Sequence, residues 1–120
     1  MKTSLLVAVL ACLPVLLQAK PTLEVVLDSS QVKNPFGVAF DEKGNTYVAE
    51  FMGGRVHKLT AGGELVTISG NGEKGFAGDG KDATKAVYNG MHNIVRTPNG
   101  DLYISDAFNN LIRKIDGKTN

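Results

Sequence analysis

The sequence predicts an all-β protein built from repeated small antiparallel sheets. Residues 44–59 recur 56 residues later as residues 100–115, with tyrosine, acidic, lysine and β-branched positions in the same order and without a gap. Each copy divides into short runs rich in Val, Ile, Thr and Tyr, separated by clusters of Gly, Asp and Asn that favour tight turns. Recurrence at a fixed spacing is typical of architectures whose modules stack on one another.

The first copy, residues 34–70, predicts four short strands at 36–40, 46–49, 55–59 and 64–68. In the third run Val56 and Leu59 are three residues apart, which predicts a bulge or a strand end there. The second copy, residues 90–120, predicts three strands at 93–96, 102–105 and 111–115, followed by a turn. We therefore expect an incomplete second module.

Residues 71–89 connect the two copies. A glycine-rich stretch is followed by Ala83, Ala86 and Val87 at helical spacing, which predicts one short helix within 81–88. Asp79 or Asp82 is expected to cap that helix.

The N-terminal segment has the pattern of a secretory signal peptide. Lys2 precedes an apolar run at 5–17, and Ala19 is a small residue suited to the cleavage site. The run is shorter than the roughly 20 residues of a membrane span. We expect residues 1–19 to be removed by cleavage after Ala19 and the remainder to be secreted or periplasmic. Cleavage before Cys12 with lipidation, or a buried N-terminal helix, are the alternatives.

Charge and cysteine content exclude several classes of function. The formal net charge of the whole chain is +1, and Lys2 is the only charged residue of segment 1–19. The remaining chain is thus balanced in charge, which argues against nucleic-acid binding. Cys12 is the only cysteine, so no disulfide or cysteine metal site is expected in the exported part.

Several short motifs resemble the NHL-repeat family of β-propellers, in its exported bacterial form. They are Asn-Pro-Phe-Gly-Val-Ala at 34–39, Gly-Asn at 44–45, Arg-Val-x-Lys-Leu at 55–59, and the spacer at 78–88 that contains Gly-Asp-Gly and alanines. The second copy departs from the pattern, since Asn93 replaces Gly37 and Thr97 replaces Asp41. The resemblance implies antiparallel four-stranded blades of an incomplete NHL-type β-propeller with one short interblade helix.

The same resemblance suggests a role for residues 20–33. In closed propellers of this family the N-terminal segment often supplies the outer strand of the last blade, and residues 23–27 place three apolar residues on one face. We expect this strand to lack its proper partner in this chain, or to pair with a non-native one. Two blades also leave sheet faces uncovered, so we expect marginal stability as a monomer.

The connecting loop carries two weak chemical motifs. Residues 70–75 fit G-x-G-x-x-G, but no helix opens directly after them, so a flexible loop is expected instead of a dinucleotide site. Glu73, Asp79 and Asp82 lack the alternate spacing of a calcium loop, which favours capping and solvation. No cofactor or metal is expected.

The two histidines receive different predictions. His57 lies beside Arg55 and Lys58 and is expected to face solvent. His92 replaces Phe36 of the first copy, at the start of an inner strand near the channel of a propeller. With Asn93 it is the best candidate binding pair. Some enzymes of the family hold a channel metal with histidines, but catalytic zinc usually needs three protein ligands.

Glu50 and Asp106 occupy the same position in the two copies. We interpret them as structural acids that accept backbone N–H bonds in the turn that follows. Neither has an evident partner for general acid–base chemistry, and no catalytic residue is assigned.

The function best supported by the sequence is a non-enzymatic binding module of a larger exported protein, with a protein, peptide or carbohydrate ligand. Two alternatives stay open. The chain could be a fragment of a channel-metal propeller enzyme, a lyase or a lactonase-like hydrolase, or a structural repeat of an envelope protein.

Overall fold

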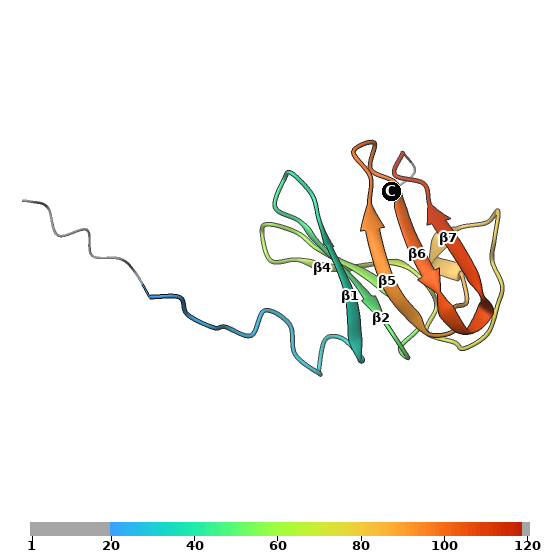
Figure 1. The fold of residues 1–120 in the computed structure, drawn as a ribbon, viewed down its shortest axis with the longest axis horizontal. Coiled ribbons are helices and arrows are strands. Elements are labelled where there is room, and N and C mark those ends of the chain that lie inside the picture. The colour runs from blue at the N-terminus through green and yellow to red at the C-terminus, as the bar shows by residue number, and fades with distance from the viewer. Residues whose placement is uncertain (1–19, 119–120) are drawn as a thin grey trace, which may run out of the picture.

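The computed structural model describes residues 20–118, which form two antiparallel sheets packed against each other (Figure 1). The first sheet has four strands in chain order and the second sheet has three. The first sheet contains β1 (Pro35–Phe40), β2 (Thr46–Glu50), β3 (Val56–Leu59) and β4 (Leu65–Ser69). The second contains β5 (Met91–Arg96), β6 (Leu102–Asp106) and β7 (Leu111–Ile115). The predicted pattern of short strands and turns is therefore present in both copies.

The turn between β1 and β2 is ordered by side chains of its own. The Asp41 carboxylate accepts hydrogen bonds from the backbone N–H groups of Lys43 and Asn45, both at 2.9 Å. Asn45 Oδ1 in turn accepts the N–H of Ala61, at 3.0 Å, from the turn between β3 and β4. Two turns distant in sequence are thereby joined at the same end of the first sheet.

The strand registers contain local irregularities. The pairing shifts between Val56 and His57, where the spacing of apolar residues predicted a bulge or strand end. The equivalent strand β7 pairs regularly with β6 along its whole length. β3 likewise pairs regularly with β2, so the shift belongs to the pairing of β3 with β4, for which the described residues of the second sheet offer no counterpart.

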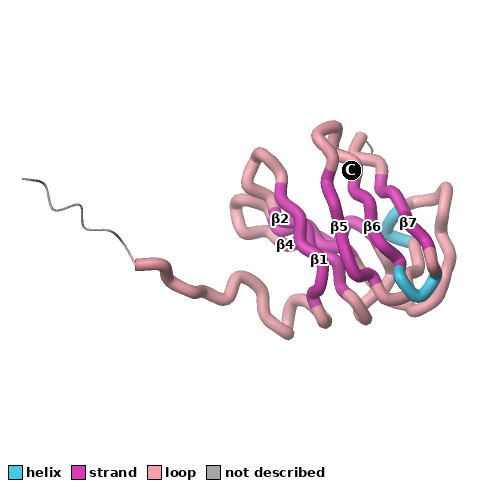
Figure 2. Tube along the Cα trace, in the orientation of Figure 1, coloured by secondary structure: helices cyan, strands magenta, loops and turns pink. Residues whose placement is uncertain are grey.

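The core of the molecule lies between the two sheets. Strands β1 and β5 lie side by side (Figure 2), and Gly37 permits this approach. A Cβ atom added at Gly37 would lie 2.9 Å from the backbone nitrogen of Ile94. The apolar residues buried between the sheets come from all three strands of the second sheet and from the first three strands of the first: Ala39, Tyr47, Ala49, Val56, Met91, Ile94, Leu102, Ile104 and Ile115.

The connection between the sheets contains the predicted short helix as a single 3₁₀ turn, η1 (Ala83–Lys85). Asp82 caps it by accepting the N–H of Thr84. After it the chain becomes extended, because Val87 forms a β-bridge with Ala77. Asp79, the other expected cap, instead binds Arg113 of β7. A second 3₁₀ turn, η2 (Ala107–Asn109), follows β6 and was not expected from the sequence.

Residues 20–26 extend away from the sheets, whereas Lys33 and Asn34, next to β1, are hydrogen-bonded to Glu50 and Phe51 (Figure 1). Residues 20–34 contain no strand, and Leu23, Val25 and Val26 are exposed. The pairing of residues 23–27 with another module stays a prediction. The expected signal peptide lies outside the described residues. Within residues 20–118, no helix has the length and apolar character needed to span a membrane.

Candidate functional site

Four ring side chains gather at one edge of the two sheets, and we call them the aromatic rim: Phe36, Phe51, His92 and Phe108. They lie at the starts of β1 and β5 and just beyond the ends of β2 and β6. The ring centroids of Phe36 and His92 are 4.6 Å apart, and those of Phe51 and Phe108 are 5.6 Å apart. Phe51 connects the two pairs, with its centroid 5.0 Å from that of His92. The sequence pointed to His92 alone, because the three phenylalanines come from separate parts of the chain.

The structure separates the predicted binding pair. His92 is exposed, with its ring in contact with Phe36 and Phe51 on the aromatic rim. Asn93 points onto the other face of the second sheet, where it lines a shallow groove with Val95 and Tyr103. Its backbone N–H donates to Ser105 Oγ at 2.8 Å. His92 and Asn93 therefore belong to two different surfaces.

Glu50 and Asp106 are fully enclosed and have equivalent partners. Glu50 accepts the backbone N–H of Lys33 at 2.7 Å, and Asp106 accepts the N–H of Asn89 at 2.7 Å. Lys33 and Asn89 occupy the same position before β1 and β5. The sequence predicted N–H donors in the turn after each acid, but the backbone donors lie in the segment before each sheet. From the turn after β6, the side-chain amide of Asn109 donates to Asp106 Oδ2.

His57 does not face solvent, contrary to the expectation from its charged neighbours. His57 is buried. It lies opposite Val48 of β2 in the strand register, and its ring lies beside the Glu50 side chain. Its Nε2 is 3.1 Å from Glu50 Oε1, and its Nδ1 is 3.0 Å from Thr67 Oγ1. His57 Nε2 therefore lies within ion-pair distance of the Glu50 carboxylate, but the two groups are not aligned for a hydrogen bond. A strand alternates its side chains between faces, so charged neighbours in sequence do not decide the exposure of His57.

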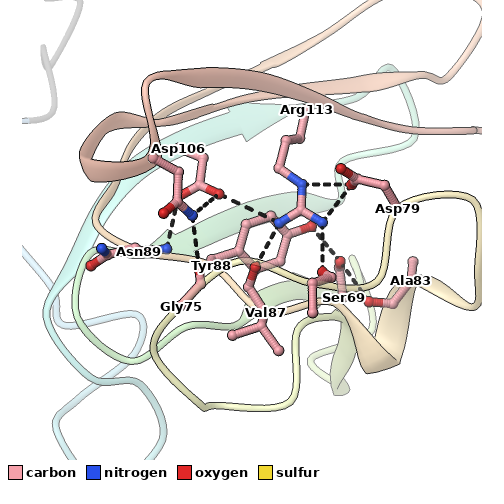
Figure 3. A network of polar contacts seen from close by, with 11 residues as sticks. Ser69, Gly75, Asp79, Ala83, Val87, Tyr88, Asn89, Asp106 and Arg113 are labelled. Atoms are coloured by element: carbon pink, nitrogen blue, oxygen red, sulfur yellow. Dashed lines mark hydrogen bonds and ion pairs between the residues drawn. The ribbon is translucent and has the colours of Figure 1, made fainter.

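Arg113 is the equivalent of His57 in the second sheet, and it binds the connecting loop (Figure 3). Its guanidinium donates to Asp79 Oδ1 at 2.6 and 2.8 Å and lies 3.4 Å from Asp106 Oδ2. It also donates to the carbonyl oxygens of Val87 and Ala77. A buried guanidinium needs such a complete set of acceptors, because desolvation of the charge is costly.

Tyr88 completes this polar network. The Arg113 guanidinium lies 4.5 Å from the centre of the Tyr88 ring, and the Tyr88 hydroxyl is 2.7 Å from Ser69 Oγ. Burial raises the pKa of Tyr88. Because these groups bind one another, the network connects β4, the loop and β7, and we interpret it as structural.

The glycine-rich segment has no open set of backbone donors for a phosphate. The N–H of Gly70 donates to Ala83 O, that of Asn71 to Ala86 O, and that of Gly75 to Tyr88 O. These bonds fold the segment back on the chain that follows. Across residues 20–118, no group of three or more His, Cys, Asp or Glu side chains is arranged to hold a metal ion.

Neither a protein-family model nor a curated protein sequence matches this chain. A crystal structure of a protein of unknown function from Bacteroides thetaiotaomicron is similar over 67% of this chain, with 28% sequence identity and a TM-score of 0.60. The chain spans 20% of the length of that protein. Virginiamycin B lyase from Staphylococcus aureus is similar over 70% of this chain and 27% of its own, with 10% identity and a TM-score of 0.43. The first similarity and the two stacked antiparallel sheets show an all-β fold of propeller type.

Proposed function

We propose that this chain is part of an exported NHL-type propeller protein and that its aromatic rim binds apolar side chains of a peptide or protein. The exposed rings carry this proposal. Phe36 and Phe108 are more than half exposed although they lie against other rings. Exposed aromatic groups that cluster in one place mark interaction sites, whereas singly scattered ones do not.

The arrangement of the rings favours apolar side chains over sugars. The planes of Phe36 and His92 are inclined by 38°, and those of Phe51 and Phe108 by 62°. A sugar stacks best on a flat aromatic face, which tilted rings do not form together. The tilted rings pack against one another and present an uneven apolar surface, which suits the contact of apolar side chains.

The placement of the histidines supports binding over metal chemistry. His57 is buried beside Glu50, so His92 is the only histidine that faces the aromatic rim. Catalytic zinc sites usually have three protein ligands. Within the described residues, the aromatic rim contains one possible metal ligand, the imidazole of His92, and three phenyl rings.

Binding to a panel of immobilised peptides tests the proposal, with a glycan panel for comparison. We expect the chain to retain peptides that contain Phe, Leu or Met. Phe36→Ala should weaken this binding by about 5- to 30-fold, the range for one interface residue worth about 1–2 kcal/mol. Val66→Ala, which truncates an exposed apolar residue of β4 outside the rim, is the matched control and should change nothing. Retention of glycans only, or equal loss in both variants, would show that the proposal is wrong.

A further inference from the structure

His92 is the polar member of the aromatic rim, and its ring nitrogens have no partner among residues 20–118. The side chain is exposed, and its contacts are those of its ring with Phe36 and Phe51. An imidazole nitrogen that carries a proton donates a hydrogen bond, and one without a proton accepts one. His92 can therefore bind a polar group of a ligand whose apolar part lies on the phenyl rings.

The position of His92 is produced by a bulge that both sheets share. Strand β1 advances one residue further than β2 across residues 35–37, which include Phe36. Strand β5 likewise advances one residue further than β6 across residues 91–94, which include His92. A bulge leaves its extra residue out of the ladder and re-aims a side chain, and bulges are frequent beside active sites. The bulge is thus a feature of the repeat, whereas the ring that it presents changes from phenyl to imidazole.

This change alters the chemistry of the rim at one point. The centroids of the Phe36 and His92 rings are 4.6 Å apart, so the two equivalent positions lie side by side. A phenyl ring offers apolar contact, whereas an imidazole adds two hydrogen-bonding atoms and ordinarily takes up a proton between about pH 5 and pH 8. The rim therefore has one place from which a hydrogen bond can be donated, next to a surface of phenyl rings.

The chain segments around the rim carry positive charge and no accessible acid. These segments are residues 33–36, 51–55, 89–92 and 107–110. Besides His92, their charged side chains are Lys33 and Arg55. The acids at the ends of β2 and β6, Glu50 and Asp106, are 2% and 0% exposed. The surroundings of the rim are therefore complementary to a negatively charged group of a ligand.

The size of the charged part favours a single carboxylate over a longer anion. A nucleic-acid strand is held by several cations along its backbone, and the formal net charge of this chain is +1. The rim places one imidazole beside three phenyl rings. This arrangement matches one acidic side chain next to one apolar side chain. A hydrogen bond from an imidazole to a carboxylate is strengthened by the charge of its acceptor.

We propose that His92 determines the specificity of the aromatic rim, and that the rim binds a peptide segment in which an acidic residue lies next to an apolar one. The apolar side chain lies on the phenyl rings, and the carboxylate accepts a hydrogen bond from His92. This inference rests on the proposed function, because it assigns the ligand chemistry of the same site. The phenyl rings supply affinity, and His92 supplies selectivity.

Titration with a pair of peptides, followed by amide chemical shifts of the full chain, separates selectivity from affinity. The probes are the blocked hexapeptide Gly-Ser-Leu-Glu-Ser-Gly and the same peptide with Gln in place of Glu. We expect the acidic peptide to bind about 3- to 10-fold more tightly, as for one charge-assisted hydrogen bond near solvent. Phe36→Ala should weaken the binding of both peptides and preserve the ratio of their affinities.

His92→Phe places the residue of the first copy in the second and should remove the preference for the acidic peptide. Lys43→Gln, which removes an exposed positive charge from the turn at the opposite end of β1, is the matched control and should keep the preference. A preference that survives His92→Phe would assign the selectivity to Lys33 and Arg55 and overturn the proposal.

The ring-nitrogen signals of the two histidines give a readout that needs no variant. We expect the acidic peptide to shift the signals of His92 more than the Gln peptide does, while those of His57, buried beside Glu50, stay in place. Unchanged His92 signals in the presence of bound acidic peptide would overturn the assignment. Tighter binding of a thymidine oligonucleotide than of the acidic peptide would also overturn it, since stacked bases would then be the preferred ligand.

The outcomes distinguish this inference from the proposed function on which it rests. If neither peptide binds, both fail. If the two peptides bind equally well to the unchanged chain and Phe36→Ala weakens both, the proposed function stands and the role of His92 is overturned.

Discussion

At the level of single residues, the two copies form the same hydrogen bond between turns with different side chains. Asn45 accepts the N–H of Ala61 in the first sheet, and its equivalent Asp101 accepts the N–H of Gly117 in the second, at 2.9 Å. The acid at position 41 becomes Thr97 in the second copy, while the acid appears at 101. The negative charge has moved within the turn, and the hydrogen bonds that order it remain.

The Asp41 carboxylate predicts an acid-dependent stability. Burial acts to raise its pKa, but hydrogen bonds from the Asn45 side chain and N–H, the Tyr47 hydroxyl and the Lys43 N–H outweigh this and hold the pKa of Asp41 well below its ordinary value. A pKa lowered by folding stabilises the native state above the unfolded-state value near 3.8. That stabilisation is lost as pH falls further toward the lower native pKa.

We therefore expect Asp41→Asn to lower the free energy of unfolding at pH 7 and to matter progressively less as the pH is lowered below about 4. Urea unfolding at a series of pH values measures both effects. Glu64→Gln, at an exposed acid of the next turn, is the control and should leave the pH dependence unchanged. If Asp41→Asn lowered the free energy of unfolding equally at pH 7 and at acidic pH, the ionised carboxylate would not be the stabilising group.

At the level of elements, the strands are positioned by close passages of the backbone. Directly after β4 the chain passes over the turn between β2 and β3. A Cβ atom at Gly70 would lie 2.0 Å from the carbonyl oxygen of Gly54, and Gly70 has a φ of +84°. Gly63, in the turn between β3 and β4, has a similar φ of +91° but no atom within 4 Å of such a Cβ.

Substitutions at Gly63 and Gly70 distinguish the energetic cost of backbone strain from that of a steric clash. Gly63→Ala should cost about 1–2 kcal/mol in unfolding free energy, the penalty of a left-handed conformation. Gly70→Ala should cost clearly more, because the carbonyl of Gly54 is backbone and has little freedom to move. Chemical denaturation of both variants gives the comparison. Equal losses would mean that the chain relaxes at Gly70 without disturbing the sheet.

At the level of the whole molecule, protection from solvent is concentrated between the sheets. The sheet interface buries Ala49, Val56, Met91 and Ile104 completely, whereas residues 20–26 are exposed and form no strand. Local opening free energies follow this difference in burial and hydrogen bonding.

Hydrogen exchange of the dilute chain should therefore show slow exchange in β2 and β6 and nearly unprotected amides at 23–27. Strong protection of 23–27 would show that this segment pairs within its own chain, and would contradict its assignment as an unpaired segment.

The sequence could predict the repeat, the strand positions and the turn residues, because these depend on local periodicity and turn chemistry. Strand 55–59 was located correctly, yet the exposure assigned to His57 within it was wrong. Exposure depends on the pairing of β2 with β3, which local composition does not contain. The short connecting helix is present as one 3₁₀ turn, but its limit at Lys85 depends on bridges from 74 and 77 to 87–88, which the local sequence does not contain.

The amino-acid sequence by itself determined that this protein is a repeat of small antiparallel sheets, because alternation and turn chemistry act between near neighbours. Only the tertiary structure decided which side chains meet: Phe36 with His92, and Arg113 with Asp79. Those contacts join positions 34 to 56 residues apart, and they form only when the two sheets and their connecting loop pack together. The aromatic rim is therefore a property of the packed pair of sheets and not of either copy alone.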